Sequence, residues 1–263
     1  MATVLSLDNK KVEDIELPEV FAQKLNSKTL HKAFLAEESK SFQLKYTDPL
    51  AGKRKVGELT KRRRSYKTVY GRGYTRTPKK ILSRNGTQFN YVGAIAPHTV
   101  GGRQAHPPKA EKVLVKEINK KERALAIKMG IAASVNKDLV SKYHRVESLQ
   151  NFPIIVDDKL NDIAKTKELE KTLYTLGLGD EVSRITSRKI RPGKGKLRGR
   201  KYKRKLGLVI VTSDTSKIKL ASGNLNIKSL KPEQLSVSDV SNSGEPGRLI
   251  VWTKSAVASF KKQ

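Results

Sequence analysis

Three short, nearly continuous runs of apolar residues interrupt an otherwise polar chain. They cover residues 152–158 (FPIIVDD), 206–214 (LGLVIVTSD) and 247–253 (GRLIVWT), and each is bounded by Pro, Gly or Asp. Runs of this length without polar alternation are typical of strands buried on both faces of a parallel sheet. Weaker runs at 3–7 (TVLSL) and 224–230 (NLNIKSL) predict two further strands.

Helical spacing is clearest just after the first of these runs. Leu169, Leu173 and Leu176 repeat at intervals of four and three residues. Gly177 follows them, and glycine is the residue most often found just beyond a helix C-cap. These residues predict a helix that ends at Gly177.

A second helix is predicted within INKKERALAIKMGIAASV. Asn119 is followed three residues later by Glu122, as in a capping arrangement. Leu125, Met129 and Ala132 would then share one face of the helix. That face is the one expected to pack against the core.

A third helix is predicted within SKTLHKAFLAEESKSFQL, where Leu30, Phe34 and Leu35 lie together after a start at Asn26 or Ser27. Strands that alternate with helices predict an α/β fold with a mainly parallel, Rossmann-like sheet flanked by helices. The sequence contains no internal repeat.

The hydrophobic content is sufficient for a folded domain, and the net charge predicts a polyanionic partner. The 263 residues are 37% hydrophobic, which is enough for a core, yet their net charge is +30. A field of this size favours nucleic acid or an anionic surface. No apolar run approaches the length of a spanning helix, and the start MATVLSLDNKKVED lacks the features of a signal peptide. We therefore expect an intracellular protein with no membrane partner.

The sequence offers few residues that could bind a metal or a cofactor. The chain has no cysteine, which excludes disulfides and thiolate zinc sites. The four histidines, His31, His98, His106 and His144, show no ligand spacing. We expect no catalytic residues, no metal site and no cofactor.

The excess charge is concentrated in two internal stretches. Residues 51–110, here called the first basic segment, carry fifteen Lys or Arg against Glu58 alone, and residues 184–205, the second basic segment, carry twelve against none. Together they hold +26 of the +30. The rest of the chain has the composition of an ordinary soluble domain.

The first basic segment shows no clear helix or strand pattern, and it is far longer than the usual connection of about 4 to 6 residues. Free in water it is expected to be largely disordered, and a solvated flexible loop is the simplest interpretation. Its many glycines and its aromatic residues favour RNA instead, because rings among cations can stack on bases. The rings in question are Tyr66, Tyr70, Tyr74, Phe89 and Tyr91.

The second basic segment contains Gly193, Gly195 and Gly199, which suggest a phosphate-binding loop of a nucleotide enzyme. Such a loop should follow a strand and open a helix, whereas this stretch leads into the strand predicted at 206–214. Contacts with the phosphates of a polynucleotide are the better interpretation.

The residues predicted to bind RNA are mostly the cations of both segments. In the first they are Lys53, Arg54, Lys55, Lys61, Arg62, Arg63, Arg64, Tyr66, Lys67, Arg72, Tyr74, Arg76, Lys79, Lys80, Arg84, Arg103, His106 and Lys109. In the second they are Arg188, Arg191, Lys194, Lys196, Arg198, Arg200, Lys201, Lys203 and Arg204.

Other conspicuous residues have structural interpretations. Asp157 and Asp158 end a predicted strand, where α/β enzymes place catalytic carboxylates, but capping of the next helix or loop is the favoured role. His98 and His106 are expected to make RNA or packing contacts. Trp252 is expected to pack in the core or at a sheet edge.

Several long motifs resemble one protein family. VGGRQAHPPK and INKKERALA occur in this order, followed by RPGKGKLRGRKYKR and GEPGRLIVWTKSA. This chain resembles the universal large-subunit ribosomal protein number four, in its archaeal and eukaryotic form, over almost its whole length. The resemblance implies an α/β globular domain on the surface of the large ribosomal subunit. It also implies a long basic loop that threads into ribosomal RNA and helps to line the polypeptide exit tunnel.

The resemblance implies a division of the chain and a set of partners. Residues 1–50 and 106–263 would form the globular domain, and 51–105 the RNA-threading loop. GRGYTR matches the family's loop tip, so the tunnel-lining residues would be Gly71, Arg72, Gly73, Tyr74 and Arg76. The implied partners are ribosomal RNA, neighbouring large-subunit proteins and the nascent polypeptide, on ribosomes in the cytoplasm, with no homo-oligomer. Gln104 departs from the family pattern, which has a second base after Arg103.

Two other functions remain open at this point. An RNA-modifying enzyme could grip its substrate with basic loops, but it would need a glycine-rich cofactor turn after its first strand, and TVLSLDNKKVED has none. A DNA-compacting protein would carry its cations on the folded surface or on tails instead of on two internal segments.

Overall fold

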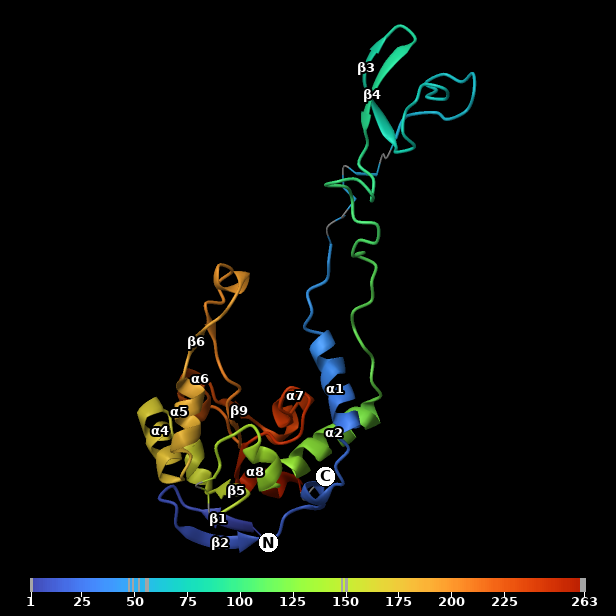
Figure 1. Cartoon of the computed structure of the whole chain (residues 1–263). Helices are drawn as coiled ribbons and strands as arrows, with labels where there is room; N and C mark the ends of the chain where they lie inside the picture. Colours follow the sequence, from blue (N-terminus) through green and yellow to red (C-terminus); the bar gives the residue numbers. More distant parts are fainter. Residues whose placement is uncertain are drawn as a thin grey trace. The chain divides into compact units, whose positions relative to one another are not determined.

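The computed structural model describes residues 2–46, 48, 50, 51, 53, 54, 57–147, 149 and 151–260. The chain divides into two compact units (Figure 1). The globular unit comprises Met1–Ser41 and Val115–Gln263, and the smaller unit comprises Phe42–Leu114. Each unit is described separately.

A six-stranded sheet forms the centre of the globular unit. Its strands lie in the order β2-β1-β5-β10-β8-β9. All neighbours are parallel except β2, which pairs antiparallel with β1 at the edge. The strands are β1 (Ala2–Leu5), β2 (Lys11–Ile15), β5 (Ile154–Val156), β8 (Val209–Val211), β9 (Lys228–Leu230) and β10 (Ile250–Thr253). All five predicted strands are therefore confirmed, whereas β2 was not predicted.

Helices cover both faces of this sheet, as predicted. Alternate residues of β5 lie in different clusters: Ile154 and Val156 face one way and Ile155 the other. The first cluster packs against α3 (Lys137–Ser141), η2 (Asp158–Asp162), α4 (Thr166–Thr175), α5 (Gly179–Thr186) and α6 (Ile218–Asn224). The second packs against η1 (Glu19–Ala22), α2 (Lys120–Ala133), α7 (Val237–Val240) and α8 (Lys254–Ser259). The helix α1 (Ser27–Ser39) packs on α2 and α7.

The order of the strands separates this sheet from dinucleotide-binding folds. In those folds the first strand lies in the middle of the sheet, at the point where the strand order reverses. Here β1 lies next to the edge, and the last strand, β10, lies between β5 and β8. The sheet is mainly parallel and covered by helices on both faces, as predicted, but its strand order differs from that of the dinucleotide-binding folds.

The predicted ends of two helices are confirmed. Asn26 caps α1, where its side chain accepts from the amides of Lys28 and Thr29 at 3.1 and 3.4 Å. Gly177 follows α4 with a φ of 83°. The amide of Gly177 donates to Tyr174 and that of Leu178 to Leu173, which is the Schellman pattern that a left-handed glycine permits.

The predicted inner face of α2 is partly wrong. Leu125 is 38% exposed, whereas Ala126, Met129 and Gly130 are buried. A Cβ on Gly130 would lie 2.3 Å from Val240 Cγ2, so the small residues of α2 face α7 and turn Leu125 outward. Asn119 occupies the N-cap position but makes no side-chain cap bond.

Both acidic residues after β5 accept hydrogen bonds at the start of a helix, and Asp157 caps the next one along the chain, as predicted. Asp157 accepts from the amide of Asp158 at the start of η2. Asp158 accepts from the amide and the hydroxyl of Ser255, at 3.0 and 2.6 Å, in the first turn of α8. Trp252 is fully buried in β10, with its ring edge-on to Phe21 at 5.2 Å, so its predicted core role is confirmed.

The smaller unit contains a hairpin that the sequence did not predict. Strands β3 (Lys79–Asn85) and β4 (Gln88–Gly93) pair antiparallel, and Gly86 adopts a φ of 56° in the two-residue turn between them. Positive φ at this place is characteristic of the tight turns that fit the twist of hairpin strands. The expectation of a first basic segment without regular structure is thus corrected.

Candidate nucleic-acid interface

The aromatic residues of the first basic segment form a cluster around the hairpin. Tyr66 lies edge-on to Phe89 with ring centroids 5.3 Å apart, and Tyr74 lies in the same way on Tyr91 at 5.6 Å. The Tyr91 hydroxyl donates to the Lys67 carbonyl at 2.9 Å, which ties this part of the chain to β4. Aromatic pairs of this kind contribute about 0.5–1.5 kcal/mol beyond their burial.

This cluster divides the predicted stacking residues into two groups. Phe89 is only 4% exposed, so it cannot present a face to a base, and its predicted stacking role is corrected. Tyr66, Tyr70 and Tyr74 are 59%, 54% and 43% exposed. These three rings keep enough free surface to stack on a partner.

Cations lie over these exposed rings. The Arg63 guanidinium is 5.0 Å from the centre of the Tyr70 ring, and Lys67 Nζ is 5.6 Å from that of Tyr66. Such contacts hold each cation beside a ring by cation–π attraction, without neutralising its charge. The surface of the smaller unit therefore carries aromatic rings with a positive charge next to each ring.

Two predicted RNA-binding lysines also have partners within the unit. Lys79 is 9% exposed, and its Nζ donates to the Thr75 hydroxyl at 2.8 Å. Lys61 Nζ donates to the Arg76 carbonyl at 3.1 Å but stays exposed. Lys79 therefore has an internal role that the sequence did not reveal.

The other predicted residues of the first basic segment lie mainly at the surface. The exposed ones are Lys53, Arg54, Lys61, Arg62, Arg63, Arg64, Tyr66, Arg72, Tyr74, Arg76, Arg84, His106 and Lys109, and the partly buried ones are Lys67, Lys80 and Arg103. Arg54 pairs with Asp48 at 2.6 Å. Lys55 lies outside the described residues.

The structure brings four of these residues around one open hollow of about 1180 Å³ in the smaller unit. Its lining includes Arg54, Arg103, His106 and Lys109. Two carboxylates, Asp48 and Glu111, also line it. The stretch matched to the family's loop tip forms a separate turn, in which Gly71 and Gly73 have φ values of 75° and 67°.

The second basic segment is an extended ribbon that belongs to the globular unit. Strands β6 (Lys189–Ile190) and β7 (Tyr202–Lys203) pair antiparallel, and η3 (Lys194–Lys196) lies in the connection between them. Arg191 Nε donates to the Arg200 carbonyl at 3.0 Å and stiffens the ribbon. Only the single turn of η3 follows Gly193, and no α-helix opens after the glycines of this stretch, as the sequence predicted when it spoke against a nucleotide-binding loop.

Most predicted RNA-binding residues of this ribbon are exposed, and Arg191 is partly buried. Within the described part of the chain, none of them forms an ion pair with a carboxylate. The exposed set is Arg188, Lys194, Lys196, Arg198, Arg200, Lys201, Lys203 and Arg204. This concentration of unneutralised charge would draw an anionic partner to the ribbon.

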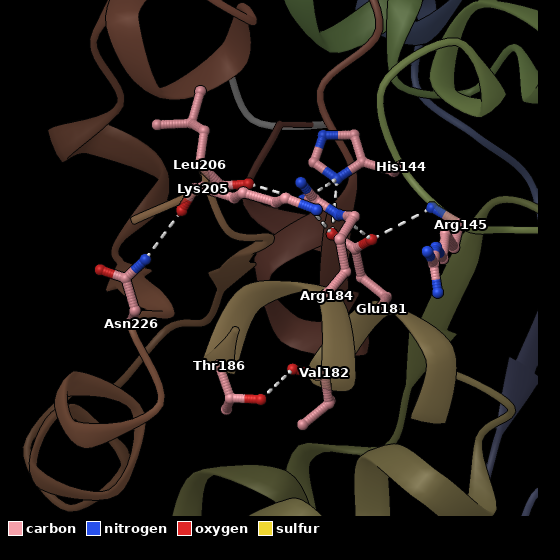
Figure 2. Close-up of polar contacts among 9 residues, drawn as sticks. All are labelled: His144, Arg145, Glu181, Val182, Arg184, Thr186, Lys205, Leu206 and Asn226. Carbon is pink, nitrogen blue, oxygen red and sulfur yellow. Dashed lines mark hydrogen bonds and ion pairs between the residues drawn. The ribbon is translucent and has the colours of Figure 1, made fainter. Parts of the chain in front are cut away.

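Two hydrogen bonds fix the end of this ribbon to the globular unit (Figure 2). Arg184 Nη2 donates to the Leu206 carbonyl at 2.7 Å, and Asn226 Nδ2 donates to the Lys205 carbonyl at 3.0 Å. This anchor was not predicted, because the residues that it joins lie more than twenty positions apart along the chain.

A buried carboxylate orients Arg184. Glu181 Oε2 accepts from Arg184 Nε and Oε1 accepts from Nη2, both at 2.7 Å, and Oε1 also lies 2.7 Å from His144 Nδ1 (Figure 2). Burial would raise the pKa of Glu181, but the hydrogen bonds from Arg184 and His144 outweigh it and lower that pKa to about 2. Burial lowers the pKa of His144, against the opposing effect of Glu181. Glu181 is thus charged and His144 neutral at pH 7.

Neither a membrane-spanning helix nor a metal-binding cluster is present among the residues that the structure describes. No helix there is long and apolar enough to span a bilayer. No cluster of three or more His, Asp or Glu side chains there could hold a metal ion.

The fold and the exposed charge define a strongly basic α/β protein with two cation-rich segments. A family model described as the ribosomal protein L4/L1 family matches residues 15–263. The large ribosomal subunit protein uL4 of Nanoarchaeum equitans is 39% identical over 98% of this chain and 96% of its own. The corresponding proteins of Methanocaldococcus jannaschii and Sulfurisphaera tokodaii are 37% and 36% identical, over 100% and 99% of this chain and 98% and 93% of their own.

The chain therefore belongs to this ribosomal protein family, in its archaeal form. The matches confirm the resemblance derived from the motifs. They also confirm that the chain is not an enzyme, because the family consists of structural ribosomal proteins.

Proposed function

We propose that this protein is a structural constituent of the large ribosomal subunit in the cytoplasm, where its two basic segments bind ribosomal RNA and support subunit assembly. The observation that carries the proposal is the distribution of charge. The two segments hold +26 of the net charge of +30, and among the described residues Arg184 is the only cation of the second segment that forms an ion pair, with Glu181. Contacts with phosphates account for such a pattern, because each cation that meets a phosphate releases a counterion.

The first basic segment supplies both phosphate contacts and stacking. Exposed Tyr66, Tyr70 and Tyr74 lie beside cations, and stacking on an aromatic ring contributes about 1–3 kcal/mol per base. Such rings suit unpaired bases better than a duplex, whose bases are already stacked. The segment would therefore contact single-stranded or looped parts of the RNA.

The turn that contains Gly71 and Gly73 is the part of the chain that we propose lines the polypeptide exit tunnel. Their positive φ values let the chain reverse within a few residues, and both Arg72 and Arg76 are exposed there. A narrow turn that presents two cations suits the wall of a channel that a nascent polypeptide passes. In this proposal residues 51–105 thread into the RNA, and the globular unit contacts neighbouring proteins at the subunit surface.

Sedimentation tests the proposal directly. The tagged chain is expressed in an archaeal host, and the ribosomal subunits are separated on sucrose gradients in high salt. The expected result is that the protein remains with the large subunit. Its release into the soluble fraction at salt concentrations that leave other large-subunit proteins bound would contradict a structural role.

A further inference from the structure

A basic cavity of about 590 Å³ lies at the base of the second basic segment, within the globular unit. Five cations line it, and none of its lining residues carries a carboxylate. They are Arg184, Lys189, Lys203, Arg204 and Lys205. Because the segment is joined to the globular unit at this place, the cavity has walls from both.

Arg184 is held rigidly in one wall. Glu181 accepts from its Nε and Nη2, and the Leu206 carbonyl accepts a further bond from Nη2. In the described part of the chain Nη1 makes no hydrogen bond. A guanidinium fixed in this way loses little side-chain entropy when it binds an anion, so its remaining donor is preorganised.

Another part of the wall is a tight turn with unusual backbone geometry. The amide of Asn242 donates to the Glu245 carbonyl at 2.7 Å, and Ser243 has a φ of 54°. A residue other than glycine rarely adopts a positive φ, and such strain is found often at binding sites. The turn packs closely on α1, since a Cβ on Gly244 would lie 2.7 Å from His31 Nδ1. Asn242 and Ser243 both line the cavity and carry polar side chains.

We infer that this cavity binds a phosphate group. Several lysines and an oriented arginine match the multiple oxygens of phosphate, which accepts charge-assisted hydrogen bonds from many directions. Glu181 already compensates the charge of Arg184, but the other four lining cations have no ion-pair partner among the described residues, and like charges around one cavity repel each other unless an anion neutralises them. The inference rests on the proposed function in one respect, namely that the phosphate comes from the backbone of ribosomal RNA instead of a free phosphate in solution.

A single introduced thiol can report on the cavity, because the chain contains no cysteine. Ser243 is exposed, so the S243C thiol is accessible to iodoacetamide in the full-length protein. We expect inorganic phosphate to slow alkylation of this thiol in a saturable manner. Sodium chloride at equal ionic strength should not do so, since it screens charge without filling the cavity.

Two further variants of S243C separate the cavity from the general positive charge. K189Q with K205Q removes two cations that line the cavity. K194Q with K196Q removes two exposed cations of η3, in the connection between β6 and β7, which do not line it. The lining pair should weaken phosphate protection by about tenfold or more, and the control pair by less than about twofold. Equal effects of both pairs, or no saturable protection at all, would overturn the inference. Circular dichroism confirms that each variant is folded.

A second arm identifies the source of the phosphate. Purified large-subunit RNA should protect the S243C thiol, and inorganic phosphate should lose its additional effect once RNA is bound. If the RNA cosediments with the protein but leaves the thiol reactive, the RNA backbone is excluded as the source while RNA binding itself stands. If the RNA does not bind at all, the proposed function fails, although the phosphate arm can still succeed.

Discussion

Arg184 Nη2 lies 2.7 Å from the carbonyl oxygen of Leu206, twenty-two residues further along the chain. This contact closes the base of the second basic segment, and Glu181 holds the guanidinium that makes it. The position of a cation-rich ribbon thus depends on one fully buried carboxylate.

Glu181 should make the folded state sensitive to acid. Its pKa falls from 4.5 to about 2 on folding, so its stabilising contribution is complete above pH 4.5 and is lost as the pH falls toward 2. The shift corresponds to about 3 kcal/mol of unfolding free energy. At pH 7, E181Q should destabilise the protein by about 3–5 kcal/mol, because Arg184 loses its buried partner.

Urea unfolding of wild type and E181Q at several pH values measures this effect. The two stabilities should converge between pH 4.5 and 2. E168Q is a suitable control, because Glu168 forms only an exposed pair with Lys165. A constant difference between wild type and E181Q across this range would show that the carboxylate charge is not responsible.

The globular unit should fold without the smaller unit. No described residue of Phe42–Leu114 belongs to the hydrophobic clusters on either face of the sheet or between α1 and α2. The amide of Lys116 donates to Ser39 Oγ at 2.9 Å, so the chain leaves and re-enters the globular unit at one place. A short Gly/Ser linker in place of residues 42–114 should therefore permit cooperative unfolding with a similar midpoint, since short loops cost little to close.

Calorimetry and RNA sedimentation check the two halves of this expectation. The shortened chain should show one sharp transition and only weak retention on large-subunit RNA through the second basic segment. A broad, noncooperative transition would mean that the smaller unit contributes to the fold of the globular unit.

Binding to RNA should be strongly dependent on salt. If about ten cations of the two segments meet phosphates, the slope of log affinity against log salt should be about −7 to −9. Filter binding of large-subunit RNA fragments from low to moderate salt measures this slope. A value shallower than about −3 is incompatible with extensive phosphate contact.

The turn at Gly71–Gly73 should affect nascent chains more than assembly. Arg72 and Arg76 are exposed, and their guanidinium groups form no hydrogen bond or ion pair with the described residues. The bonds at these two residues are made by the backbone, from the Arg72 amide to Val69 and from Lys61 to the Arg76 carbonyl. R72A with R76A should therefore leave the smaller unit folded and subunit assembly normal, while it changes pausing of nascent polypeptides. Ribosome profiling measures the pausing, and R84A in the hairpin serves as the control. Unchanged pausing would place the tunnel-lining residues elsewhere in the first basic segment.

The predicted elements were those with strong local signals. The three strong apolar runs and the two weaker ones predicted the five parallel strands that the structure describes, and Gly177 predicted the end of α4. The face of α2 could not be predicted, because it depends on the close approach of Gly130 to Val240, more than a hundred residues away. The spacing of Leu125, Met129 and Ala132 predicted the inner face, but small residues determine which face of α2 can pack most closely.

The site was predicted in composition but not in geometry. Charge counting located both basic segments, yet β3 was hidden because Lys79, Lys80 and Arg84 outnumber its apolar residues. The Gly86 turn before Phe89 and Tyr91 was the available signal for a hairpin. Glu181 and Arg184 form an i,i+3 pair within α5, but the anchor could not be inferred, since Arg184 meets His144 and the Leu206 carbonyl only through the tertiary fold.

The hydrogen bond between Ser39 and Lys116 also bears on how members of this family can diverge. Because the two ends of residues 42–114 are fixed beside each other, this part can lengthen, shorten or change sequence without disturbing the sheet. Selection on RNA contacts can therefore act on the smaller unit almost independently of selection for a stable core. Insertions and deletions among relatives should accumulate between these two residues rather than within the strands.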